Sequence, residues 1–276
     1  MNIQSVIDKV VERLRDVNGV EAVVLGGSRA KGTHHAKSDI DIGLYYDGSK
    51  GLDMAGLKKA ASALDDEHRE EAVTDIGGWG PWINGGGWLT VDSAPVDILY
   101  RDLKRVEETM DQCLSGTVTI DYQPGHPHGF LNAVYVAEMA LCKVLWDPGK
   151  QVEKLKSRLH PYPAALKEAL INKFLWEAGF ALETGRKGIA KGDLSYVAGC
   201  CFRSVSCLNQ VLFALNECYW MNEKGASAIA ASFRLVPPRY EERVNAVFRF
   251  ISDDPNTLEQ SMDLLQQLVT EVNQLL

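Results

Sequence analysis

The sequence predicts an α+β protein, with a mixed β-sheet flanked by helices in its N-terminal half and an α-helical bundle in its C-terminal half. Short β-like runs alternate with amphipathic helices up to residue 128, and nearly every later segment has helical spacing. The loop "PGHPHG", residues 124–129, separates the two patterns. We therefore expect one domain over residues 1–128 and a second over residues 129–276.

The elements of the first half follow from apolar periodicity and turn residues. Helical spacing from Ile3 predicts a first helix that ends near Asn18, and the apolar run 20–25 predicts a buried strand. Acid–apolar alternation predicts a second strand over 39–46. The remaining expectations are helices at 53–70 and 101–113, a hairpin with strands at 88–91 and 96–100, and a last β-like run at 117–122.

The second half reads almost entirely as helix. Long apolar-periodic segments are joined by Gly and Pro breaks, which is typical of a helical bundle. The expected helices span residues 130–146, 149–158, 163–187, 194–220, 240–251 and 256–275.

Composition limits the class of protein. The net charge of -8 argues against a protein that coats nucleic acid, so nucleic acid is not an expected partner. No run of 18 apolar residues and no signal-peptide core occurs, so we expect a cytoplasmic protein without a membrane partner. The six cysteines form no Cys-x-x-Cys pair and are expected to be buried free thiols: Cys113, Cys142, Cys200, Cys201, Cys207 and Cys218.

Three aspartates in β-like runs indicate a cation site. Asp39 and Asp41 stand two residues apart in a strand, so their carboxylates project from one face. Paired carboxylates repel one another unless a cation lies between them, and oxygen-only ligands favour magnesium or manganese. Asp97 lies in a similar run, "APVDILY". Three such carboxylates can hold two metal ions about 3.5–4 Å apart, an arrangement suited to in-line displacement at phosphorus.

A glycine-rich corner precedes these acids. Gly26, Gly27 and Ser28 follow the strand 20–25, and ten residues separate Ser28 from Asp39. Glycines at such a corner let backbone N–H groups approach a phosphate, and a serine hydroxyl can donate to it. Arg29, Lys31 or Lys37 could neutralise negative charge there. The corner is neither a Walker A loop nor a dinucleotide-binding fingerprint, because neither spacing is present.

The stretch "LGGSRAKGTHHAKSDIDIGL" resembles the signature of the nucleotidyltransferase superfamily, which includes DNA polymerase β and the antibiotic nucleotidyltransferases. That signature joins a Gly-Gly/Ser corner, a gap of about ten residues, Asp-apolar-Asp and a third acid in a later strand. The resemblance covers roughly residues 20–101, and the order of the two domains also resembles the antibiotic-modifying members.

The resemblance implies that an acceptor hydroxyl attacks the α-phosphate of a nucleoside triphosphate and that pyrophosphate leaves. By this resemblance Asp39 and Asp41 ligate two Mg²⁺ ions and Asp97 ligates the one nearer the attacking oxygen. The nucleotide, with ATP expected as donor, is held at Gly26, Gly27, Ser28, Arg29 and Ser38.

A general base for the acceptor comes from the helical domain in some relatives, and Glu138 is the candidate here. The alternative is a structural role in which Glu138 pairs with a cation such as Lys143. His126 and His128 either line a cleft or order the junction of the domains. Trp79, Trp82 and Trp88 either stack on a base or sugar or pack within the hairpin, and we favour packing.

The expected function is therefore magnesium-dependent transfer of a nucleoside monophosphate to a hydroxylated small molecule. A nucleotide-binding regulatory protein and a protein-modifying adenylyltransferase are the alternatives. A template-dependent polymerase or RNA-tailing enzyme is disfavoured because the chain lacks a basic surplus. The sequence leaves open whether the protein is a homodimer.

Overall fold

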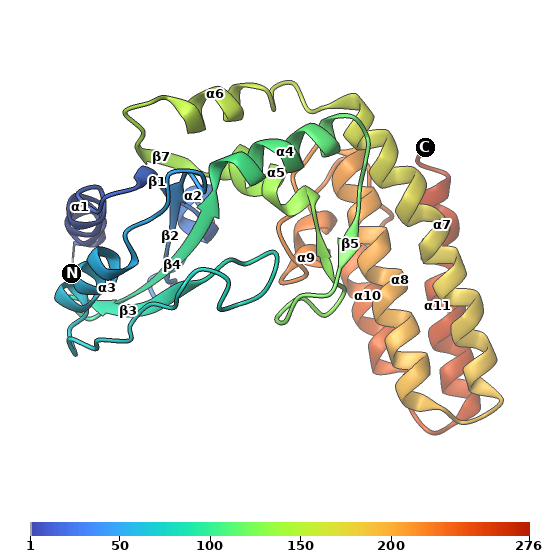
Figure 1. The fold of residues 1–276 in the computed structure, drawn as a ribbon. Helices are drawn as coiled ribbons and strands as arrows, with labels where there is room; N and C mark the ends of the chain where they lie inside the picture. Colours follow the sequence, from blue (N-terminus) through green and yellow to red (C-terminus); the bar gives the residue numbers. More distant parts are fainter. Residues whose placement is uncertain (1) are drawn as a thin grey trace. The chain divides into compact units, whose positions relative to one another are not determined.

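The computed structural model describes residues 2–276 and divides into two compact units (Figure 1). The first unit comprises the chain up to Asp111 together with Asp121–Gly125 and Tyr135–Pro161. The second comprises Gln112–Ile120, His126–Val134 and Tyr162–Leu276. This division differs from the single cut expected at residue 128, because residues 135–161 include a strand that pairs with the sheet of the first unit.

The first unit is built on a five-stranded mixed sheet with the order β3-β4-β2-β1-β7. β2 and β4 are parallel, and every other neighbouring pair is antiparallel. The strands are β1 (Val20–Leu25), β2 (Ile40–Tyr46), β3 (Gly86–Val91), β4 (Ala94–Asp102) and β7 (Lys143–Trp146).

One face of this sheet is covered by helices α1 (Ile3–Leu14) and α3 (Met54–Leu64). Apolar residues at helical spacing on α1, such as Val6 and Val10, pack with alternate strand residues such as Ile40 and Ile98. Asn2 caps α1, and its side chain accepts from the Gln4 N–H. The intervening strand residues therefore point to the opposite face.

The other elements of the first half connect or flank this sheet. Helix α2 (Gly27–Lys31) follows β1 directly, and α4 (Leu103–Leu114) follows β4. α5 (Ala133–Leu141) and α6 (Gln151–Ser157) flank β7 in sequence. A separate two-stranded sheet joins β5 (Ile120–Asp121) and β6 (Phe130–Leu131).

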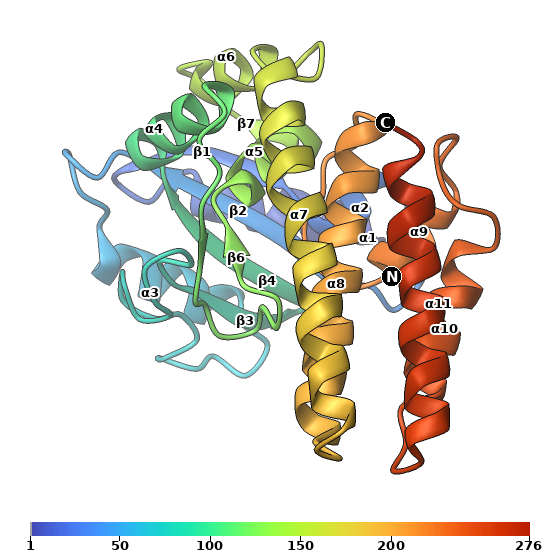
Figure 2. The ribbon, with the colours of Figure 1, turned by 90° about the vertical axis from the view of Figure 1, so that its right-hand side faces the viewer.

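The second unit is a helical bundle in which the long helices run side by side (Figure 2). Its helices are α7 (Ala164–Ile189), α8 (Leu194–Leu215), α9 (Ala226–Ala231), α10 (Tyr240–Arg249) and α11 (Pro255–Asn273). Asp193 caps α8 by accepting from the Tyr196 N–H, as its position in the sequence predicts. By length and composition alone α8 would suffice to cross a membrane, but 72% of its most apolar window is buried inside the structure, as in a core helix.

The predicted fold class is confirmed, with corrections in detail. The expected helix 130–146 is wrong at both ends, because Phe130–Leu131 form β6 and Lys143–Trp146 form edge strand β7. The two short helices α2 and α9 were not anticipated as full elements, and α3 ends at Leu64, earlier than expected. None of the six cysteines, all within residues 2–276, forms a disulfide; Cys200 and Cys218 are partly exposed.

Candidate functional site

Asp41 and Asp97 lie side by side on the face of the sheet opposite to α1 and α3. In the parallel pairing of β2 with β4, Asp41 is the register partner of Asp97. Their neighbours Ile40, Ile42 and Val96 are fully buried on the other face. The strand alternation therefore brings these two predicted acids to one surface, as the sequence pattern required.

The glycine corner is fitted to Asp41. The Gly26 N–H donates to the Asp41 carbonyl at 2.8 Å, which joins the corner to β2. Gly27 has a φ of +57°, and a Cβ at this position would collide with the Asp41 carboxylate. Only glycine satisfies both conditions, so the corner and the acid form one unit.

Arg29 and Ser38 hold the loop before the acids rather than extending into solvent. The buried Arg29 guanidinium donates to the carbonyls of Ser38 at 2.6 Å and Asp39 at 3.0 Å. The Ser38 hydroxyl accepts from the His35 N–H at 3.0 Å. These contacts fix the backbone at Asp39, which immediately precedes β2 rather than beginning it as expected, and they favour a positioning role for Arg29.

The surroundings of Asp41 disfavour its negative charge. Burial, followed by the charge of Asp39, raises the pKa of Asp41 above its ordinary value, while Lys31 and Arg29 oppose the rise. A cation beside this pair would stabilise both carboxylates. The donor atoms of Asp39 and Asp41 are all oxygen, so the chemistry of these residues fits a hard divalent cation.

The side chains of Asp39, Asp41 and Asp97 are not gathered into a metal-binding cluster in this structure. Within residues 2–276, no three His, Cys, Asp or Glu side chains are gathered closely enough to hold a metal ion. The register places Asp97 beside Asp41, but side-chain torsions decide where the carboxylates point. The three-acid metal site thus stays a prediction.

Glu138 is engaged in an ion pair. Its two carboxylate oxygens accept from Nε and Nη2 of Arg101, each at 2.7 Å. Arg101 is 2% exposed, and its guanidinium also lies 5.1 Å from the Tyr135 ring centre. In the register of β2 with β4, Arg101 of β4 pairs with Tyr45 of β2. This arrangement favours the structural alternative for Glu138, with Arg101 rather than Lys143 as the partner.

His126 and His128 belong to the helical unit. The His128 N–H donates to Glu223 at 2.8 Å, and its carbonyl accepts from Arg203 at 2.7 Å. Neither ring nitrogen of His128 has a hydrogen-bond partner among residues 2–276, and burial, then Arg203, lowers its pKa to about 3. His126 lies 3.8 Å from Glu223. Both residues therefore serve to anchor their loop to the bundle.

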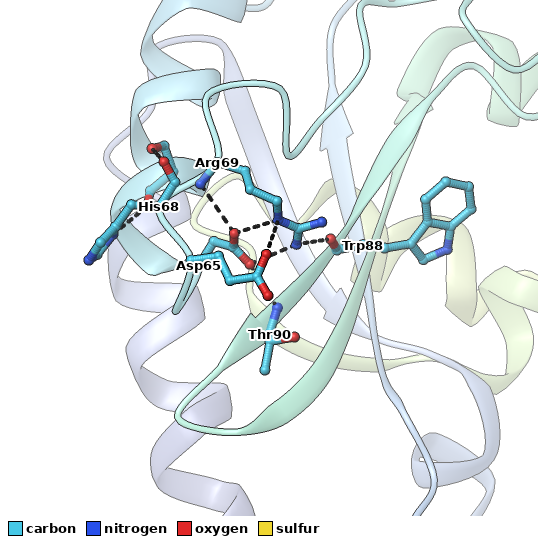
Figure 3. Close-up of polar contacts among 7 residues, drawn as sticks. Asp65, His68, Arg69, Trp88 and Thr90 are labelled. Atoms are coloured by element: carbon cyan, nitrogen blue, oxygen red, sulfur yellow. Dashed lines mark hydrogen bonds and ion pairs between the residues drawn. The ribbon is translucent and has the colours of Figure 1, made fainter.

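The hairpin is anchored by a contact that the sequence analysis missed. The Asp65 carboxylate accepts from Arg69 and from the Thr90 N–H, and Arg69 also donates to the Trp88 carbonyl (Figure 3). The Arg69 hydrogen bonds hold the pKa of the buried Asp65 far below its ordinary value. Asp65 and Arg69 have opposite charges and stand four residues apart, and this spacing was the sequence signal for an ion pair.

The three tryptophans of the glycine-rich segment have different surroundings. Trp79 stacks on Trp88 with ring centres 4.5 Å apart, and Trp88 is 61% exposed. Trp82 packs edge-on against Tyr135 and donates to Asp121 at 3.0 Å. Packing within the first unit thus accounts for Trp82, whereas Trp88 presents its ring to solvent.

A mixed sheet with a Gly-Gly-Ser corner after β1 and acids on parallel neighbours β2 and β4 is the fold of a nucleotidyltransferase. Residues 7–110 match the family described as nucleotidyltransferase domain, and residues 131–224 match a family described as domain of unknown function (DUF4037). Residues 7–110 therefore form a nucleotidyltransferase domain, and this domain indicates a transferase of nucleotidyl groups that uses a nucleotide as substrate.

The chain is also similar to a solved structure of a nucleotidyltransferase-like protein from Exiguobacterium sibiricum 255-15. The TM-score is 0.47 and the identity 8%, over 98% of this chain and 75% of the other. No curated protein matches the chain at a significant level.

Proposed function

We propose that the protein is a magnesium-dependent enzyme that transfers AMP from ATP to a hydroxyl group of a small molecule. The acceptor oxygen forms a bond to the α-phosphorus, and the bond from that phosphorus to the β-phosphate bridging oxygen breaks. The products are the nucleotidylated acceptor, pyrophosphate and the proton of the hydroxyl.

One observation carries the proposal. Asp41 stands beside Asp97 in the register of β2 and β4 and fills the space above Gly27. This puts a glycine corner suited to phosphate next to carboxylates suited to a cation. Positioning and neutralisation of charge are what phosphoryl-group chemistry demands.

Each residue then has a defined task. Asp39, Asp41 and Asp97 would hold Mg²⁺, or Mn²⁺ in its place, and the metal would neutralise phosphate charge and polarise the reacting oxygens. Gly26, Gly27 and Ser28 would accept the triphosphate. Arg29 holds the Ser38–Asp39 backbone by its two hydrogen bonds. Six cysteines without a disulfide in the described residues support a reducing compartment such as the cytoplasm.

The test compares Asp41→Asn with Asp47→Asn, the same substitution in the turn that follows the same strand. Binding of ATP with magnesium and release of pyrophosphate are measured with a pooled set of hydroxylated metabolites and antibiotics. We expect both signals to be lost in Asp41→Asn and kept in Asp47→Asn. Equal binding and turnover in the two variants would contradict the proposal, and turnover only with a protein acceptor would favour the protein-modifying alternative.

A further inference from the structure

One row of residues crosses the sheet at the level of the acids, on the face opposite to α1 and α3. Gly26 lies beside Asp41, Asp41 is the partner of Asp97, and Asp97 is the antiparallel partner of Trp88. Directly paired residues of neighbouring strands project to the same face. Because strands lie about 4.8 Å apart, Trp88 stands about one strand spacing from Asp97 and two from Asp41.

Trp79 supports one face of the Trp88 ring. The two rings stack at an angle of 27°, and the Trp79 ring lies so close to Gly86 that a Cβ there would stand 2.9 Å from it. Trp79 therefore covers the side of Trp88 nearer Gly86. Trp88 is nevertheless 61% exposed, so much of its ring stays open to solvent while Trp79 stacks on one face.

The backbone beneath this ring is also fixed. β3 is an edge strand, and Arg69 satisfies the outward Trp88 carbonyl at 2.8 Å while Asp65 accepts from the Thr90 N–H at 2.9 Å. Figure 3 shows the Trp88 indole extending away from this ion pair. A rigid aromatic ring with one supported face and one open face is a platform for stacking.

The direction of the proposed reaction identifies the ligand. In an in-line displacement the incoming oxygen approaches opposite to the leaving group. The leaving pyrophosphate belongs at Gly27 and Ser28, at one end of the row. The acceptor hydroxyl must then approach from the other end, where Asp97 and Trp88 lie.

We propose that Trp88, supported by Trp79, binds a ring of the acceptor, so that the substrates are ring-bearing alcohols rather than open-chain polyols. This inference rests on the proposed function for the position of the leaving group. The ring stacks its apolar face on the indole, and a hydroxyl on the same ring or a neighbouring one reaches the Asp97 side. Sugar and aromatic rings share this chemistry.

The test is ¹⁹F NMR of the full chain labelled with 5-fluorotryptophan, which does not depend on turnover. The Trp88 resonance is assigned with Trp88→Phe, and the exposed Trp176 of α7 provides the control resonance. The probes are methyl β-D-glucopyranoside, tyramine, glycerol, and α,β-methylene-ATP with Mg²⁺. We expect the sugar or the aromatic ring to move the Trp88 resonance alone, and which one does so identifies the class of ring.

Other outcomes would overturn the inference. If the Trp88 resonance moves with the ATP analogue alone, Trp88 contacts the nucleobase and not the acceptor. If neither ring probe moves the Trp88 resonance at tens of millimolar, no ring binds at Trp88. Asp41→Asn should leave the response to the ring probe unchanged, which separates this inference from the proposed function. Where an acceptor is turned over, Trp88→Ala should raise its KM about ten-fold with the KM for ATP unchanged.

Discussion

The Asp41 carboxylate lies in the space that a side-chain carbon on Gly27 would occupy, and Gly27 adopts a φ of +57°. Local backbone geometry at the end of β1 thus determines where Asp41, the acid of β2, can stand. The relationship explains why the glycine and the aspartate occur together, although 13 residues separate them in the sequence.

Gly27→Ala should disable the enzyme while leaving it folded. The added methyl group displaces the Asp41 carboxylate, and a displacement of about 1 Å at a reacting centre costs on the order of 100-fold in kcat/KM. Gly32→Ala is the matched control, because Gly32 also has a positive φ of 74° but nothing lies within 4 Å of its added carbon. Both variants should lose about 1 kcal/mol of stability in urea titrations, and only Gly27→Ala should lose activity.

Arg29→Lys should lower kcat more than it lowers stability. A lysine has one nitrogen and cannot reproduce the two directed hydrogen bonds to the carbonyls of Ser38 and Asp39. We expect a loss of about ten-fold in kcat, because Asp39 is less well positioned. Arg186→Lys is the control, since Arg186 also binds two acceptors, Glu259 and Asp263, within the helical bundle. Equal activity in the two variants would refute the positioning role.

Removing Glu138 should destabilise the protein because it leaves the buried Arg101 guanidinium unpaired. Glu138→Leu is expected to cost about 3–5 kcal/mol in the free energy of unfolding, measured by urea denaturation. The double variant Arg101→Met with Glu138→Leu should recover most of this loss. A variant Glu138→Gln with unchanged stability and greatly reduced kcat would instead assign Glu138 as the general base.

Asp65 should give the stability a defined dependence on pH. Arg69 lowers its pKa in the folded protein, so the ionised form stabilises the fold fully above the unfolded-state pKa near 4. That contribution is lost as the pH falls from this value through the lower folded-state pKa. Asp65→Asn should therefore lower the free energy of unfolding by about 1–2 kcal/mol between pH 5 and 8. The loss is no larger because Arg69 is half-exposed and solvent weakens the ion pair. Below pH 4 the difference between the variant and the original protein should shrink. A difference that stays constant down to pH 2 would contradict this account.

Much of this architecture could be predicted from local patterns. The apolar run of β1, the acid–apolar alternation of β2 and the hairpin of β3 and β4 are short-range signals, and the structure confirms all three. The signature around Gly27, Asp39 and Asp41 likewise depends on close spacing.

What the sequence could not reveal depends on tertiary pairing. β7 reads as the end of a helix, because the strand β1 that pairs with it lies more than 100 residues earlier. The Arg101–Glu138 pair joins residues 37 apart in the sequence, and their relation is defined only once β4 and α5 are folded together.

Asp39, Asp41 and Asp97 are proposed to support transfer of a nucleotidyl group. ATP labelled in different phosphates tests this role most directly. With an accepting substrate, label in the α-phosphate should appear on the acceptor, and label in the γ-phosphate should appear in pyrophosphate. Both signals should vanish in Asp41→Asn and Asp97→Asn. Label from the γ-phosphate on the acceptor, or undiminished transfer in both variants, would contradict the account.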